Sequence, residues 1–122
     1  MKFKILILFI LIVGFSQIRG QQKLSDKAVI SVITCGPGDV LYTSFGHSAF
    51  RIYDPEIQLD KIYNYGTFDF NAPNFYLNFA KGNLTYQLAT QSFSRFLLIY
   101  KYEDRWVKAQ ELDLTTTENQ EI

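Results

Sequence analysis

An uncharged apolar run near the N-terminus determines how much of this chain is left to fold. Residues 5–15 contain no charged or polar side chain, and Lys2 and Lys4 precede them. Such a run after a positive start is typical of a secretory signal peptide, and it is shorter than the roughly 20 residues that a membrane-spanning helix needs. We expect cleavage after the small residue Gly20, so residues 1–20 are the predicted signal peptide. An uncleaved N-terminal anchor is the alternative.

The predicted mature chain, residues 21–122, has the size of one small domain. It holds 102 residues, enough for a single hydrophobic core. Lys2, Lys4 and Arg19 leave with the signal peptide, so nine basic and twelve acidic side chains remain, a net charge of −3. No basic run is left, so we expect no nucleic-acid partner. We expect membrane contact only through the signal peptide before cleavage. The sequence carries no indication of the oligomeric state.

Along the mature chain, segments with the two-residue hydrophobic period of strands alternate with segments that have the 3.6-residue period of helices. Residues 28–34 read as a buried strand, 47–53 and 61–66 as an antiparallel pair, and 84–89 and 106–114 as further strands. Residues 73–80 and a segment capped by Ser92 read as helices. The predicted fold class is therefore α+β, with a small antiparallel sheet and two or three helices. Seven aromatic side chains between residues 63 and 79 are expected to be mostly core, with a sugar-stacking platform as the alternative.

The only cysteine and the only histidine are the first candidates for chemistry. Cys35 cannot form an internal disulfide, and its place at the end of an apolar strand predicts a buried structural thiol. The alternation over residues 47–53 puts Phe50 and Ile52 on the expected core face and His47 on the other. A histidine so placed can act as a general base, although a lone histidine can also be structural. Asn64 on the returning strand would orient the ring, with Asp69 as the alternative.

Other polar residues have plainer explanations. Asp39 is expected to cap a short helix over residues 40–45 rather than to bind a metal. Asp54, Glu56 and Asp60 share one loop whose spacing does not match a calcium site, so we expect a solvated turn. Arg51 is expected to form a surface ion pair, with anion binding as the alternative. No cofactor and no metal site is predicted.

The end of the chain carries a helix-start signal. Thr115 and Glu118 have the spacing of a capping box, and Ile122 follows four residues later. A helix stub of this length gains little from hydrogen bonding or packing. We therefore expect a fragment of a longer protein, with a frayed C-terminus as the alternative.

Several motifs together resemble a known family. The chain is similar to the Lnb N-terminal periplasmic domain, a bacterial family of unknown function, over about residues 28–122. The motifs that carry the resemblance are Cys35-Gly36-Pro37-Gly38-Asp39, Phe45-Gly46-His47-Ser48-Ala49 and Tyr63-Asn64-Tyr65-Gly66-Thr67-Phe68-Asp69-Phe70. The family in turn looks like circularly permuted papain-like thiol hydrolases of the NlpC type.

The resemblance implies a location, an activity and a division of roles. It implies an exported protein of the periplasm or outer cell envelope, with part of a permuted papain-like domain. His47 would be the catalytic base and Asn64 its orienting residue. The nucleophilic cysteine would belong to an Asn-Cys segment downstream of residue 122, so this chain alone would be inactive.

The implied activity is that of a thiol hydrolase or transferase acting on amide or ester bonds. Its substrates would be peptides, glycans or lipids of the cell envelope. The alternative is a non-enzymatic module that binds glycan or peptide through its aromatic groove, or that assists assembly.

Overall fold

Five antiparallel strands form one sheet in a computed structural model that describes residues 22–122. The predicted signal peptide lies outside these residues. The strands have the spatial order β4-β3-β2-β1-β5. They are β1 (Val29–Cys35), β2 (His47–Asp54), β3 (Leu59–Phe68), β4 (Tyr86–Ser92) and β5 (Val107–Glu111). A 3₁₀ turn and three helices complete the fold: η1 (Leu41–Thr43), α2 (Phe75–Ala80), α3 (Phe93–Tyr102) and α4 (Thr116–Glu121). The predicted α+β class is confirmed.

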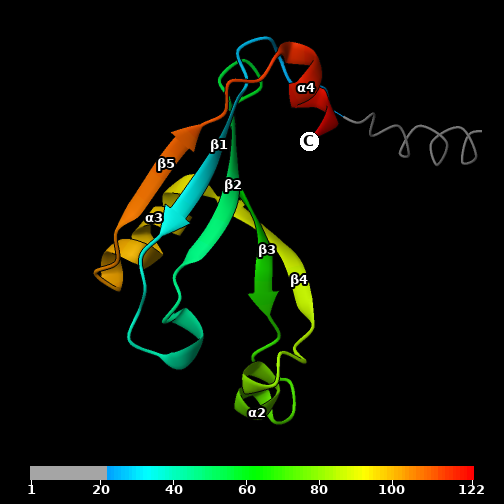
Figure 1. Cartoon of the computed structure of the whole chain (residues 1–122). Coiled ribbons are helices and arrows are strands. Elements are labelled where there is room, and N and C mark those ends of the chain that lie inside the picture. Colours follow the sequence, from blue (N-terminus) through cyan, green and yellow to red (C-terminus); the bar gives the residue numbers. More distant parts are fainter. Residues whose placement is uncertain (1–21) are drawn as a thin grey trace, which may run out of the picture.

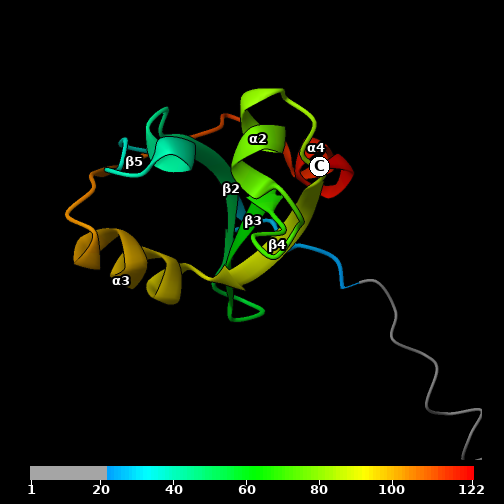
Figure 2. The same ribbon diagram turned by 90° about the horizontal axis from the view of Figure 1, so that it is seen from below.

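The helices are distributed over the two faces and the two ends of the sheet. Figure 1 shows α4 at one end, next to the start of the described chain, and η1 and α2 at the opposite end. Seen along the sheet, α3 lies on one side of β2, β3 and β4, and α4 lies on the other (Figure 2). The two faces of the sheet therefore have different coverings.

The buried core lies between α3 and the three central strands. Ile33, Ala49 and Ile62 supply the sheet side, and Phe96 and Tyr100 supply the helix side. Ile33 and Ala49 are direct partners in the antiparallel β1–β2 register, so their side chains project to the same face. Phe96 is only 1% exposed. This cluster therefore determines which face of the sheet is interior.

The predicted core face of β2 was wrong. Phe50 and Ile52 are half-buried and lie on the face away from α3, whereas Ala49 is buried beneath it. The alternation of a strand separates two faces but does not say which one a helix covers. The small residue Ala49 belongs to the buried cluster that Phe96 and Tyr100 complete from the helix side. His47 shares the face of Ala49 and so stands at the border of the core.

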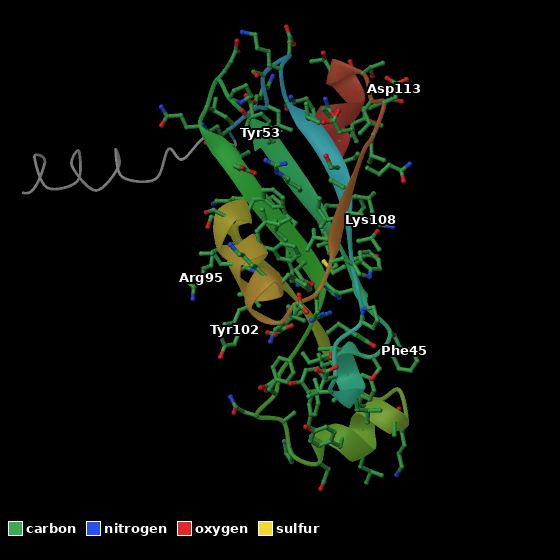
Figure 3. The ribbon with its side chains drawn as sticks, turned by 90° about the vertical axis from the view of Figure 1, so that its left-hand side faces the viewer. Phe45, Tyr53, Arg95, Tyr102, Lys108 and Asp113 are labelled. Atoms are coloured by element: carbon green, nitrogen blue, oxygen red, sulfur yellow. The ribbon has the colours of Figure 1, made fainter. Side chains whose placement is uncertain are left out.

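Helix α3 begins where its sequence predicts. The Ser92 hydroxyl accepts a hydrogen bond from the Arg95 backbone N–H, which caps the first turn. Phe96 and Tyr100 face the sheet as expected, but Leu97 is partly exposed and is not core. Arg95 and Tyr102 lie on the outer side of the helix, pointing away from the sheet (Figure 3).

Three local predictions need correction. The segment after β1 makes the 3₁₀ turn η1 rather than a helix over residues 40–45, and Val40, not Asp39, precedes its first residue. Helix α2 starts at Phe75 because Asn74 adopts a left-handed conformation. The strand predicted over residues 84–89 is β4, Tyr86–Ser92, and it is exposed along most of its length, because it is an edge strand that α3 covers only in part.

Asp54 is not in a solvated turn, contrary to the prediction. Its side chain is fully buried and accepts hydrogen bonds from the Ser25 backbone N–H at 2.6 Å and from the Ser25 hydroxyl at 2.7 Å. The Glu56 backbone N–H donates a third at 3.0 Å. Burial by itself raises the pKa of Asp54, but these hydrogen bonds outweigh it and lower the pKa.

Helix α4 is held to the start of the described chain. The predicted capping box of Thr115 and Glu118 is confirmed. Gln120 exchanges two hydrogen bonds with the Leu24 backbone, and the Asn119 amide donates to the Ala28 carbonyl. The expectation that so short a helix gains little from hydrogen bonding was therefore wrong, because these bonds join it to residues more than 90 positions away.

Truncating the core side chain of α3 tests the packing. We expect Phe96→Ala to lower the free energy of unfolding by about 3–5 kcal/mol, because it leaves a cavity between helix and sheet. The control is Leu98→Ala on the same helix, where the side chain is 66% exposed and the change should stay within about 0.5 kcal/mol. Urea unfolding followed by circular dichroism measures both, and equal losses would contradict the assigned interior face.

The Asp54 contacts predict how stability depends on pH. A carboxyl whose pKa is lower in the folded state contributes stability that is present above its unfolded pKa, about 3.9, and that is lost as the pH falls through the folded pKa. Asp54→Asn should therefore destabilise the protein at neutral pH, and the gap to the wild type should narrow below about pH 4. Thermal melts between pH 2 and 7 measure this gap, with the exposed Asp113→Asn as control; a gap independent of pH would contradict the assignment.

Candidate functional site

His47 is the first residue of β2. The residue before it, Gly46, is a glycine because of the backbone geometry at position 46. Gly46 has a φ of +74°, a conformation that L side chains rarely adopt. A Cβ built at Gly46 would lie 2.6 Å from the Cys35 carbonyl oxygen. Its backbone N–H donates to the Thr43 carbonyl. The glycine therefore turns the chain out of η1 and lets β2 pair with β1 from its first residue.

The imidazole of His47 is hydrogen-bonded to Asn64, as the sequence predicts. Nε2 lies 2.7 Å from the Asn64 Oδ1, and the same oxygen accepts the Gly66 backbone N–H at 3.2 Å. The Gly66 contact fixes the orientation of the amide, because an amide NH₂ could not accept it. Oδ1 is therefore an acceptor, and Nε2 carries the proton. This tautomer leaves a lone pair on Nδ1.

Gly66 keeps one side of the imidazole open. A Cβ at this position would lie 3.2 Å from Cε1 and 3.8 Å from Nδ1 of His47. Within residues 22–122, no hydrogen bond reaches Nδ1. A neutral imidazole with a positioned Nε2–H and a lone pair on Nδ1 that no described residue engages has the arrangement that a general base needs.

Asp69, the alternative orienting residue, does not contact the histidine. Its side chain is exposed and accepts the Asn71 backbone N–H at 3.0 Å within its own turn. Of the two residues that the sequence offered, the structure brings only Asn64 to His47. The reason is that Asn64 lies within β3, whereas Asp69 follows the end of that strand.

Cys35 is the β1 partner of His47 in the register, but its thiol is enclosed. The residue is 2% exposed, which confirms the expected burial. Burial raises the pKa of the Cys35 thiol, and a hydrogen bond from the Tyr100 hydroxyl and the charge of Arg105 only partly offset this. A buried thiol with a raised pKa is inert as a nucleophile.

Tyr100 and Arg105 close the core beside Cys35. Burial, followed by the neighbouring Cys35 thiol, raises the pKa of Tyr100, so the phenol stays protonated. The Arg105 guanidinium lies 4.5 Å from the centre of the Tyr100 ring and donates to the Gly36 carbonyl at 2.9 Å. These contacts tie α3 to the loop that precedes η1.

Arg51 forms the ion pair that was expected of it. Nε and Nη2 donate to the two carboxylate oxygens of Asp60 at 2.7 and 2.9 Å. Its guanidinium carbon also lies 3.8 Å from the centre of the Phe93 ring. Because its guanidinium N–H groups bind Asp60 and its planar face stacks on Phe93, Arg51 joins two strands to α3. It is therefore not available to bind an anion.

Most of the aromatic residues between 63 and 79 form a second packed cluster at the α2 end of the sheet. Phe75 contacts the largest share of the rings, and it is buried. The other members of this cluster are Tyr42, Phe68, Phe70, Tyr76, Phe79 and Tyr86. Phe70 and Tyr76 are 56% and 59% exposed, so the expectation that these rings are mostly core was wrong: they pack against one another, but only Phe75 is buried. Tyr63 and Tyr65 stay outside the cluster and lie on the uncovered face of the sheet.

Two residues of the site were missed by sequence reasoning. Gly66 was read only as the end of a strand, although its spacing of two from Asn64 was a usable signal. No local pattern indicates that Tyr100, from the helix after Ser92, lies beside Cys35 in the core. Among the described helices, none is long and apolar enough to cross a membrane.

The fold and the site define a small α+β domain with a histidine–asparagine pair at one end of its sheet. Residues 15–122 match the family described as Lnb N-terminal periplasmic domain, and the chain belongs to this family. Membership supports an exported protein with a periplasmic location. No curated protein and no solved structure matches the chain.

The geometry around His47 predicts the response of the ring to its neighbours. In the wild type, ¹⁵N NMR of the neutral imidazole should report the Nε2–H tautomer. Asn64→Leu should mix the two tautomers because the acceptor is lost, and Gly66→Ala should shift the ring signals because its methyl group meets Cε1. The control Asn71→Leu lies outside the site and should leave the spectrum unchanged. A wild-type ring with its proton on Nδ1 would contradict the assignment.

Proposed function

We propose that this chain supplies the general base of an exported thiol-dependent hydrolase or acyltransferase that acts on amide or ester bonds of cell-envelope material. The observation that supports it best is the 2.7 Å hydrogen bond from His47 Nε2–H to Asn64 Oδ1. That bond orients the ring and leaves the Nδ1 lone pair toward the side that Gly66 keeps open. His47 is the proposed catalytic base, and Asn64 is the proposed positioning residue.

In the proposed reaction, the His47 imidazole first accepts a proton and then donates it. Nδ1 takes the proton of a thiol, which makes the thiolate that attacks the carbonyl carbon. The imidazolium then gives the proton to the leaving amine or alkoxide as the acyl–enzyme forms. Water or an acceptor group releases the acyl group in a second step that uses the same base. Asn64 accepts from Nε2–H throughout and so keeps the ring in place.

Cys35 is not the proposed nucleophile. Its sulfur is buried beneath α3 and accepts from Tyr100, and its pKa is raised by burial. We propose instead that the nucleophile lies in an Asn-Cys segment downstream of residue 122, as the resemblance to permuted papain-like hydrolases implies. This assignment gives the two cysteines opposite behaviour toward thiol reagents.

The first test reads the DNA beyond codon 122. The proposal expects a reading frame that continues into a helical segment with Asn-Cys. A stop codon without such a segment would remove the enzymatic proposal for this chain.

The second test measures kcat/KM of the longer protein on acyl esters and amides. We expect His47→Ala to lower kcat/KM by about 10²–10⁴-fold, the usual contribution of a general base. Asn64→Leu should lower it by less, since it acts through the histidine. Asn71→Leu and Cys35→Ala should retain turnover, and iodoacetamide should label the downstream cysteine but not Cys35 in the folded protein. Activity that survives His47→Ala would falsify the assigned base.

A further inference from the structure

Helix α3 is apolar on its solvent side as well as on the side that faces the core. Four of its ten residues are large apolar side chains that are at least 38% exposed: Leu97, Leu98, Ile99 and Tyr102. A helix that is hydrophobic all round is normally covered on all sides. Within residues 22–122, no element covers this side, and Tyr102 is 92% exposed. The solvent side of α3 therefore has the composition of a contact surface.

Two cations lie on either side of the outermost apolar residues of α3. Because an α-helix turns by about 100° per residue, Leu98 and Tyr102 lie opposite the buried Phe96, with Arg95 on one side of them and Lys101 on the other. Figure 3 shows Arg95 and Tyr102 pointing away from the sheet. Both cations are exposed, and the three ion pairs of residues 22–122 use other basic residues. The apolar strip is thus flanked by two cations that no described carboxylate neutralises.

The local charge at α3 is positive although the protein is acidic. The helix itself has no acidic residue. Glu103, which follows it, lies 2.7 Å from Nη1 of Arg105, and Asp104 is the next acid along the chain. The predicted mature chain has a net charge of −3, but at physiological ionic strength charges are screened beyond about 8 Å. A surface in contact with α3 is therefore affected mainly by Arg95 and Lys101.

The size and charge of this surface select among partners. A helix of this length is about 15 Å long and 10 Å wide, whereas a stable protein interface buries about 800 Å² on each partner. A second copy that used the same face would bring cations against cations, which is unfavourable. A lipid bilayer needs no matching shape. Interfacial helices lie with their apolar face at the boundary between headgroups and acyl chains, and their Lys and Arg residues are attracted to anionic lipids.

We propose that α3 docks this protein on the surface of a bilayer that contains anionic phospholipids. Leu98 and Tyr102 enter the boundary between headgroups and acyl chains, and Arg95 and Lys101 lie at the level of the lipid phosphates. The long aliphatic parts of the two basic side chains allow them to reach this level from either side of the strip. The periplasmic location that the family supports puts the protein beside membranes. Docking does not use the histidine–asparagine pair and is independent of the proposed function.

The far side of the molecule offers matched controls. The face of the sheet that α3 leaves uncovered has a groove of about 600 Å³, with β2 and β3 as its floor and residues 22–24 and α4 as its walls. Tyr65 belongs to the lining of this groove and is 57% exposed. Lys108, on the edge strand β5, lies on the opposite side of the molecule from Arg95 and Tyr102 (Figure 3). Changes at Tyr65 and Lys108 should therefore leave docking through α3 unaffected.

Co-sedimentation of the mature protein, residues 21–122, with vesicles tests the charge requirement. At low ionic strength, vesicles of equimolar phosphatidylglycerol and phosphatidylcholine should bind at least about tenfold more tightly than phosphatidylcholine alone. About 1 M salt, which shortens the screening length to about 3 Å, should remove this difference. Arg95→Gln and Lys101→Gln should each weaken binding to the anionic vesicles about fivefold, the contribution of one basic side chain near such a surface. Lys108→Gln should leave binding unchanged, and Asp104→Asn should strengthen it.

The apolar requirement is tested at the centre of the strip. Leu98→Ala, which is expected to leave folding stability almost unchanged, should weaken binding to the anionic vesicles about tenfold, because less apolar surface leaves water. Tyr102→Trp should show a blue shift of its fluorescence on the anionic vesicles, after subtraction of the wild-type Trp106 signal. Tyr65→Trp, at a similarly accessible position in the groove, should show none.

Four results would overturn the proposal. The first is equal binding to the two kinds of vesicle, and the second is no binding to the anionic vesicles at millimolar lipid. The third is a loss of binding in Lys108→Gln as large as in Arg95→Gln. The fourth is competition by poly-glutamate that displaces the protein from the vesicles and is itself weakened by Leu98→Ala, which would assign the surface to an acidic protein partner.

Discussion

The packing of Phe96 and Tyr100 against Ile33, Ala49 and Ile62 is the interaction on which the rest of this structure depends. It places α3 over one face of β1, β2 and β3 and so makes that face the interior. Since side chains along a strand alternate, a slip of one residue in β2 would exchange its two faces. The same slip would move His47 away from Asn64. The choice of interior face that this cluster makes therefore determines on which side of the sheet the imidazole lies.

Features that depend on contacts between residues close in sequence were predicted correctly, and features that depend on distant contacts were missed. The caps at Ser92 and at Thr115 with Glu118 were predicted because donor and acceptor are three residues apart. The burial of Asp54 was missed because its partner, Ser25, is 29 residues away. The interior face of β2 was missed for a related reason, since a helix more than 40 residues downstream decides it. The fold class and the order of the elements could thus be predicted from the sequence, whereas the interior face of each strand could not.

The candidate site shows the same division. His47 and Asn64 were predicted together because residue type and a hairpin arrangement were enough to pair them. The open side at Gly66 and the enclosure of Cys35 by Tyr100 depend on tertiary contacts that no local pattern encodes. The sheet carries the histidine–asparagine pair on one face and the groove on the other. Neighbouring residues of one strand, such as Ala49 and Phe50, therefore belong to different surfaces.

The hydrogen bonds between Leu24 and Gln120 have a consequence for the order in which the parts of this protein fold during export. The two residues are 96 positions apart, and a chain that crosses a membrane in extended form delivers its N-terminal part first. Residues 22–24 then lack their final partners until residue 120 has also been translocated. Contacts of such long sequence separation form late because the loop they close is long. The wall that α4 and residues 22–24 build together therefore forms only after residue 120 has been exported: a chain stalled shortly before that point would have its sheet but not its groove.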